Sequence, residues 1–216
     1  MTPTTSSSTS NPSLRPVPAA LQIDAEDLSQ RIALATPADT CKGMFLNGLF
    51  DASKRIKGQP AYELLKDLAG TRKFVDFFNY PIVDFLPLAW KAAEQIGGGT
   101  TSPQLENGVR TLGHQAASDF LATAVGKTLL LLAGNEPRRL MNSLPAGYKT
   151  AVSYGTRSLT WHSEKRCTFA MRRDFMPHPY HEGVLRQALE AVGAKQVTAV
   201  GKRVGVLDTD YEVSWT

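Results

Sequence analysis

The sequence predicts an α+β protein in which a layer of N-terminal helices packs on a C-terminal four-stranded antiparallel sheet. Two observations support this fold class. From about residue 21 to 150, apolar side chains recur at helical spacing. From 151 to 216, short runs suited to strands surround one helical run, in the order β-β-α-β-β. Such a sheet needs a second layer to complete its core, so we expect the upstream helices to cover it.

The first two strands are predicted at Ser153–Trp161 and Arg166–Arg172. Both runs are rich in β-branched, aromatic and hydroxyl side chains, and apolar residues alternate in the second. The polar segment His162–Lys165 lies between them and indicates a hairpin.

A helix is predicted at Tyr180–Val192, where apolar residues share one helical face. Gly193 is a typical residue after a helix end, because glycine adopts the left-handed conformation readily. The last two strands are predicted at Val197–Val206 and Tyr211–Trp215, with an aspartate-rich turn between them.

The helical part is divided by proline, glycine and capping residues. The predicted helices are Asp24–Ala35, Thr40–Lys57, Ala61–Leu68, two helices within Arg72–Ile96 that break near Tyr80, a long helix from Ser102 with a continuation to Leu132, and a short helix from Pro137 to Asn142.

The chain is predicted to consist of one tail and one domain. Residues 1–20 are rich in Ser, Thr, Asn and Pro, which predicts a disordered tail. Residues 21–216 are predicted to form a single α+β domain, with a helical part at 21–150 and a sheet module at 151–216.

Composition narrows the class of protein. The apolar fraction of 42% suffices for a normal core. No run of eighteen apolar residues predicts a transmembrane segment, and the N-terminus lacks the order of a signal peptide. Cys41 and Cys167 lie far apart, which favours two reduced thiols and a cytoplasmic protein.

Positive charge is concentrated in the C-terminal half. Residues 138–203 hold 12 Lys and Arg against 4 Asp and Glu, a charge of +8, so with +4 overall the rest carries −4. This asymmetry predicts either an anion-binding face or a solvated basic surface. The candidate ligand- or anion-binding residues are Trp161, Arg166, Arg172, Arg173, Lys202 and Arg203.

Two glycines in one predicted helix and an aromatic stretch indicate close packing, either against another helix or against a second copy of the chain. The aromatic stretch also suits the wall of an apolar ligand cavity. The candidate interface residues are Gly43, Gly48, Phe74, Phe78, Phe85 and Trp90.

Catalytic patterns are missing from the sequence. It contains no nucleophile elbow, HExxH or paired-carboxylate pattern, so we expect a protein that is not an enzyme. His178 and His181 are the candidate metal ligands, but a zinc site needs three or four converging ligands, and we expect no metal.

Several motifs resemble a large paralogous family of myxobacterial proteins of unknown function. They are Cys41–Gly48, Arg173–Pro177, Tyr180–Leu185 and Tyr211–Trp215, and the resemblance covers roughly Ala38 to Thr216.

The layout is also distantly similar to the superfamily that joins haem nitric-oxide-binding domains, four-vinyl-reductase-type domains and TRAPP subunits. That similarity implies helices packed on an antiparallel sheet, often around an apolar pocket. Its haem members have a histidine after the long helices and a Tyr-x-Ser-x-Arg motif. Here no histidine lies near Leu144, and Trp161–Lys165 matches the motif only in part. We therefore expect no cofactor.

The leading hypothesis is a non-enzymatic signalling or regulatory domain that acts through protein–protein contacts, as a dimer. The first alternative is a sensor of a small apolar or anionic molecule. The second is nucleic-acid binding through the basic half, which ranks last because interleaved stacking aromatics are missing.

Overall fold

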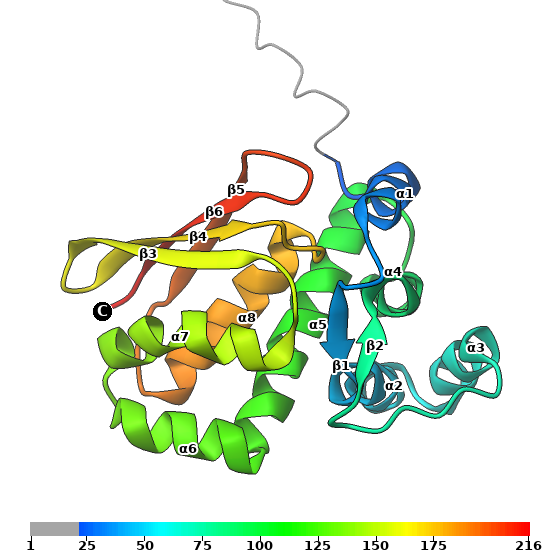
Figure 1. The fold of residues 1–216 in the computed structure, drawn as a ribbon, viewed down its shortest axis with the longest axis horizontal. Helices are drawn as coiled ribbons and strands as arrows, with labels where there is room; N and C mark the ends of the chain where they lie inside the picture. Colours follow the sequence, from blue (N-terminus) through cyan, green and yellow to red (C-terminus); the bar gives the residue numbers. More distant parts are fainter. Residues whose placement is uncertain (1–21) are drawn as a thin grey trace, which may run out of the picture.

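The computed structural model describes residues 22–216 (Figure 1). The prediction of a tail at residues 1–20 lies outside this part of the chain. The elements are α1 Ala25–Leu34, β1 Thr40–Lys42, α2 Gly43–Lys57, α3 Gln59–Ala69, β2 Asn79–Pro81, α4 Ile82–Gly97, α5 Ser102–Ala122, α6 Ala124–Ala133, α7 Pro137–Ala151, β3 Thr156–Ser163, β4 Arg166–Arg172, α8 His178–Ala191, β5 Thr198–Arg203 and β6 Thr209–Ser214.

The predicted fold class is confirmed. The C-terminal part forms a four-stranded antiparallel sheet in the order β3-β4-β6-β5, with α8 between β4 and β5 in the chain. The strand register follows from the alternation of buried and more exposed side chains. In β4, Cys167, Phe169 and Met171 all point to the buried face of the sheet.

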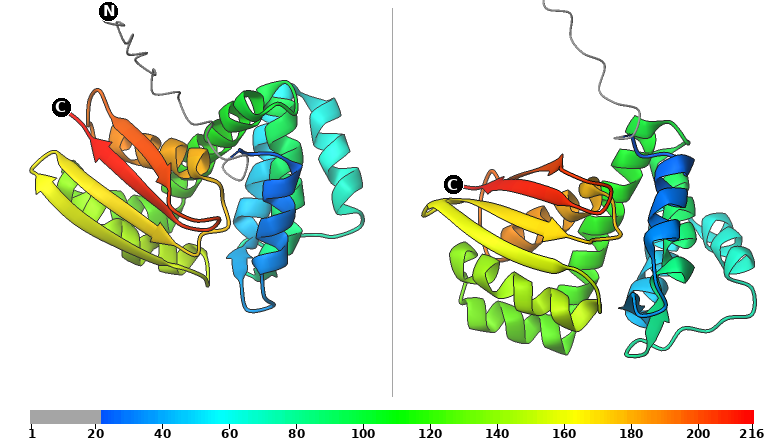
Figure 2. Two further views of the ribbon diagram at one scale, coloured as in Figure 1. Left: turned by 90° about the horizontal axis from the view of Figure 1, so that it is seen from above. Right: turned by 45° about the horizontal axis from the view of Figure 1, so that its top comes forward.

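Two helices cover that face of the sheet (Figures 1 and 2). Met141 and Leu144 of α7 and Leu185 and Leu189 of α8 pack with the buried side chains of the strands. A second apolar cluster fills the space among α2, α4, α5 and the start of α8. The helical layer expected from the sequence therefore meets the sheet module mainly through α5 and α8.

Helices α5 and α8 cross at very short distance. A Cβ atom on Gly113 would lie 1.8 Å from the carbonyl oxygen of Tyr180, and one on Gly183 would lie 2.1 Å from the carbonyl oxygen of Arg110. Only glycine leaves room for two helix backbones at this separation. This crossing holds the helical part against the sheet module.

The structure corrects three local predictions. The helix predicted to end at Asn142 continues through Pro145 to Ala151 as α7. Thr40–Lys42 was predicted to begin a helix, but it pairs with Asn79–Pro81 as a two-stranded antiparallel ladder. The first part of Arg72–Ile96 was predicted to be helical, but residues 72–78 connect α3 to β2 without a helix. A three-residue ladder is too short to show a period of two, and it is stabilised by its partner strand rather than by local propensity.

No single helix within residues 22–216 combines the length and the apolar character of a membrane span. The pair α5 and α6 passes that test together, but the two helices meet at 88°.

Candidate functional site

An apolar cavity of about 100 Å³ lies where the helical part meets the sheet module. Its wall is built by β1, α2, α4, α5, α6, α7, the start of β3, and α8 with the segment before it. Apolar side chains of the wall include Phe45, Phe85, Phe120, Leu121, Leu144 and Val184. Phe85 comes from the aromatic stretch for which the sequence left a cavity wall as an alternative.

Four polar side chains line the same cavity and form one hydrogen-bonded chain. The Tyr148 hydroxyl lies 2.9 Å from His181 Nδ1, and His181 Nε2 lies 2.8 Å from Asp174 Oδ1. The other carboxylate oxygen of Asp174 accepts from Arg157 Nη2 in a buried ion pair. We call Tyr148, Arg157, Asp174 and His181 the polar chain.

The polar chain is held by four separate segments of the C-terminal part of the chain. Tyr148 lies on α7, Arg157 on β3, Asp174 between β4 and α8, and His181 on the first turn of α8. The Arg157 guanidinium also lies 4.9 Å from the centre of the Tyr148 ring, a cation–π distance. The Met176 backbone N–H donates to Asp174 Oδ1 at 3.0 Å.

Burial shifts the pKa values of this region. Burial alone would raise the pKa of Asp174, but His181, Arg157 and the Met176 N–H together hold it well below its ordinary value. Burial raises the pKa of the Tyr148 hydroxyl well above its ordinary value. Burial, aided by the charge of Asp84, raises the pKa of the Cys41 thiol to about 12. The carboxylate is therefore ionised at neutral pH, while the phenol and the thiol are protonated.

The predicted anion-binding residues do not converge on one site. On the sheet, Arg172 Nη2 pairs with Asp210 at 2.6 Å and Arg166 Nη2 lies 3.5 Å from Glu212. Lys202 is exposed on β5.

Trp161 stacks under Arg138 rather than facing the other candidate residues. The Arg138 guanidinium lies 4.1 Å from the centre of the indole ring. The Trp161 Nε1 donates to Asn142 at 3.0 Å.

Two further arginines of the basic half pair with acidic residues of the N-terminal half. Arg203 Nη2 lies 2.8 Å from Asp27 in a pair with side chains 4% and 2% exposed. Arg173 Nη2 lies 2.6 Å from Asp39. Folding thus brings two basic side chains of the C-terminal half against two acidic side chains of the N-terminal half.

The predicted interface residues are mostly internal. Phe85 and Trp90 are each 3% exposed, and the Phe74 ring packs against other aromatic rings of the chain. A Cβ on Gly43 would lie 2.2 Å from the Val75 carbonyl oxygen, so the close packing expected there is made within this chain. Phe85 and Trp90 therefore belong to the core, and Phe74 is half-buried against it.

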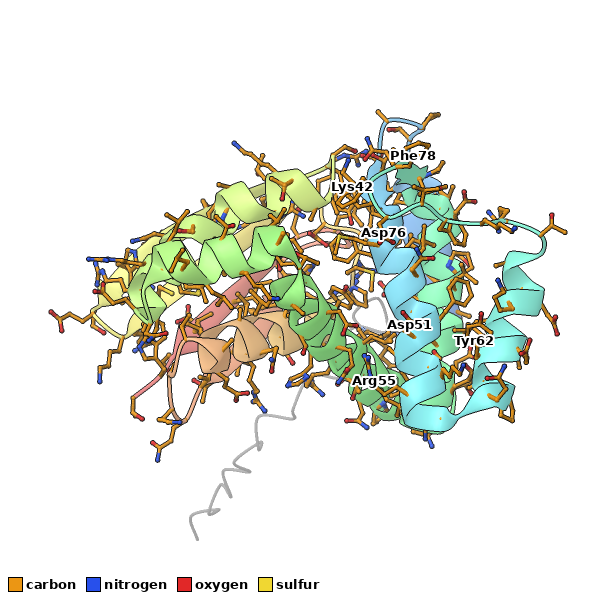
Figure 3. The ribbon with its side chains drawn as sticks, turned by 90° about the horizontal axis from the view of Figure 1, so that it is seen from below. Lys42, Asp51, Arg55, Tyr62, Asp76 and Phe78 are labelled. Carbon is orange, nitrogen blue, oxygen red and sulfur yellow. The ribbon has the colours of Figure 1, made fainter. Side chains whose placement is uncertain are left out.

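The two remaining interface candidates are more accessible. Gly48 is half-buried on α2 and borders a small hollow beside α5. Phe78 is 64% exposed in the segment before β2, near Lys42 (Figure 3).

The two histidines considered as metal ligands have separate surroundings. His181 belongs to the polar chain, and His178 is the first residue of α8. Within residues 22–216, no group of three or more His, Cys, Asp or Glu side chains is placed to hold a metal ion.

The polar chain was missed by the sequence analysis. The sequence analysis assigned Arg157 to a strand, Asp174 to a loop and Tyr148 to a connecting segment. Each lies in a segment with no unusual local pattern. The one available signal was Tyr154 followed by Arg157 at the entry to the first strand, a spacing one residue shorter than that of Tyr-x-Ser-x-Arg. Both residues line the cavity, whereas Trp161 does not.

Comparison with known proteins identifies a family and a fold. The family model described as "Protein of unknown function (DUF2378)" matches residues 34–216. No curated protein matches the chain. The resemblance to a family of unknown function is thereby confirmed.

The fold matches solved structures of H-NOX proteins. An H-NOX protein from K. algicida in the Fe(II) unliganded state is 12% identical, with a TM-score of 0.63 over 81% of this chain and 96% of that one. An H-NOX protein from S. oneidensis in the Fe(II)NO ligation state is 13% identical, with a TM-score of 0.60 over 81% and 99%. The distant similarity to haem nitric-oxide-binding domains is confirmed at the level of the fold.

These structures contradict the prediction of no cofactor. H-NOX proteins are described by their iron ligation states, and another matching structure concerns haem distortion in the H-NOX family. The layout therefore gave no ground for excluding haem, and the residues around the cavity must decide whether haem fits.

The residues in this chain do not fit haem as they are arranged. His181 is the histidine that lines the cavity, and both of its ring nitrogens are already hydrogen-bonded. The Cys41 thiol is protonated at neutral pH, so it is a poor iron ligand. Arg157, a cation suited to a propionate, is already paired with Asp174.

Proposed function

We propose, from the premise that this chain belongs to the family described as "Protein of unknown function (DUF2378)", that it is a sensor domain for a small molecule. The ligand occupies the apolar cavity between the helical part and the sheet module. The domain changes the activity of a partner rather than catalysing a reaction; the non-enzymatic role and the cytoplasmic location stay predictions.

The cavity is the observation that carries this proposal. It combines a mostly apolar wall with a few converging polar groups whose pKa values are shifted, which is typical of ligand sites. Its wall is shared by helices of both parts, so an occupant contacts both and stabilises their packing.

Native mass spectrometry with an absorbance spectrum tests the proposal directly. We expect purified protein to carry, or to take up, a small molecule that raises its melting temperature. The variant Ala117→Leu fills the cavity from α5 and should abolish this uptake. The matched control is Ala122→Leu, which adds the same atoms to an exposed position of α5. Uptake that survives Ala117→Leu would place the ligand elsewhere and contradict the proposal.

Self-association is a second candidate, supported by one observation. Phe77 and Phe78 are 76% and 64% exposed in adjacent positions. Lys42 Nζ donates to the Phe77 carbonyl oxygen at 3.0 Å, and Phe78 lies near Lys42 (Figure 3). Adjacent exposed aromatics are common in protein contacts. Sedimentation should show a mass that rises with concentration for the natural chain and for Val200→Asp, which changes a residue 61% exposed on β5. Phe78→Asp should stay monomeric; association that persists in Phe78→Asp would refute this contact.

A further inference from the structure

The polar chain has an internal charge balance. Among the polar side chains that line the cavity, the two with permanent charge at neutral pH are Arg157 and Asp174, and they pair with each other. Their side chains are 2% and 5% exposed, so water screens neither of them. The cavity therefore offers no free cation or anion to an occupant.

Hydrogen bonds along the polar chain engage its members with one another. His181 Nε2 lies 2.8 Å from Asp174 Oδ1, and His181 Nδ1 lies 2.9 Å from the Tyr148 hydroxyl, so both ring nitrogens have partners within the polar chain.

The size of the cavity limits its occupant. A cavity of about 150 Å³ lined by apolar side chains holds benzene. The cavity of about 100 Å³ therefore suits roughly four or five non-hydrogen atoms, or the apolar end of a longer molecule. Transfer of an anion into this space would leave its charge buried without a partner, which costs far more than burying a neutral group.

We propose that the cavity selects small neutral apolar molecules and rejects anions, haem propionates included. This inference rests on the proposed sensor function and names its ligand class. A neutral apolar occupant leaves the Arg157–Asp174 pair intact and brings no charge that would need a partner of its own.

Titration of isotope-labelled protein with three probes of equal size tests the inference by NMR at neutral pH. The probes are cyclopentane, butanone and propionate. We expect shifts at cavity residues, with cyclopentane and butanone both binding and propionate binding at least tenfold more weakly than butanone. Propionate binding as tightly as butanone, or a Soret band and stoichiometric uptake on addition of haem, would overturn the inference but leave the sensor function standing.

Two variants provide the control, and each removes one of the two opposite charges of the ion pair. Asp174→Asn leaves Arg157 unbalanced and should gain affinity for propionate. Arg157→Met leaves Asp174 unbalanced and should favour propylammonium, a cation of similar length. The inference is wrong if neither variant changes the affinity for charged probes relative to neutral ones. It is also wrong if both variants fail to fold and the natural chain binds propionate as tightly as butanone. No binding of any probe to the natural chain would contradict both the inference and the sensor function.

Discussion

Replacing Asp174 by Asn tests whether the polar chain holds the site together. The Asp174 side chain is 5% exposed and accepts hydrogen bonds from Arg157, His181 and the Met176 N–H. Asparagine keeps the shape and one acceptor oxygen, but it removes the charge. The Arg157 side chain, 2% exposed, would then be a buried cation without a counter-charge.

The expected loss of unfolding free energy follows from that burial. Breaking a buried ion pair by removing one partner costs about 3–5 kcal/mol, a large part of the roughly 5–15 kcal/mol of a typical domain. Urea denaturation followed by circular dichroism at pH 7 should show the midpoint falling by about 1–5 M, for a slope of about 1–3 kcal/mol per molar urea. The double variant Arg157→Met, Asp174→Asn removes both charges and should recover most of the loss.

Acid pH gives an independent readout of the same residue. The pKa of Asp174 is lower in the folded chain than its unfolded value of about 3.9. The ionised carboxylate therefore stabilises the fold fully above about pH 4, and this contribution is lost as pH falls further. Asp174→Asn should lack this loss. A variant that costs less than about 1 kcal/mol, or that weakens in acid as steeply as the natural chain, would refute the reasoning.

Three further predictions test the packing, the buried histidine and the thiols. Gly113→Ala should lower the unfolding free energy by about 1–3 kcal/mol, because its Cβ would lie 1.8 Å from a carbonyl oxygen of α8. Gly147→Ala should raise the unfolding free energy by roughly 0.5–1 kcal/mol, because its Cβ would have no atom within 4 Å. Equal effects of the two variants in urea melts would contradict the close crossing of α5 and α8. Burial lowers the pKa of His178 to about 4, so the natural chain should lose stability as pH falls from about 6.5 to 4, and His178→Gln should flatten that slope in melts across pH. Burial raises the pKa values of Cys41 and Cys167 to about 12 and about 11. Both thiols should therefore react with a disulfide reagent at pH 8 only when the chain unfolds. Rapid reaction of the native chain would disprove their burial.

Local pattern was enough to predict the elements of the sheet module. The period-two alternation of Arg166–Arg172 and the helical face of Tyr180–Val192 depend on neighbours in the sequence, and both appear as strand β4 and helix α8. The Asp24 cap was also predictable, because an aspartate before a helix accepts from N–H groups of the first turn, here those of Glu26 and Asp27. These features follow from short-range geometry, which a sequence displays directly.

The candidate site depends on contacts that no local pattern displays. Tyr148 and His181 are 33 positions apart, Arg157 and Asp174 are 17 apart, and Asp27 meets Arg203 across 176 positions. Each of these residues suits an ordinary surface helix, strand or loop, so propensity assigns it no partner. The cavity arises because α5 and α8 cross at glycines and leave the adjoining space only partly filled by alanines and phenylalanines. Helices and strands are set by interactions within a few residues, whereas charge pairing and cavity shape are properties of segments that meet only after folding.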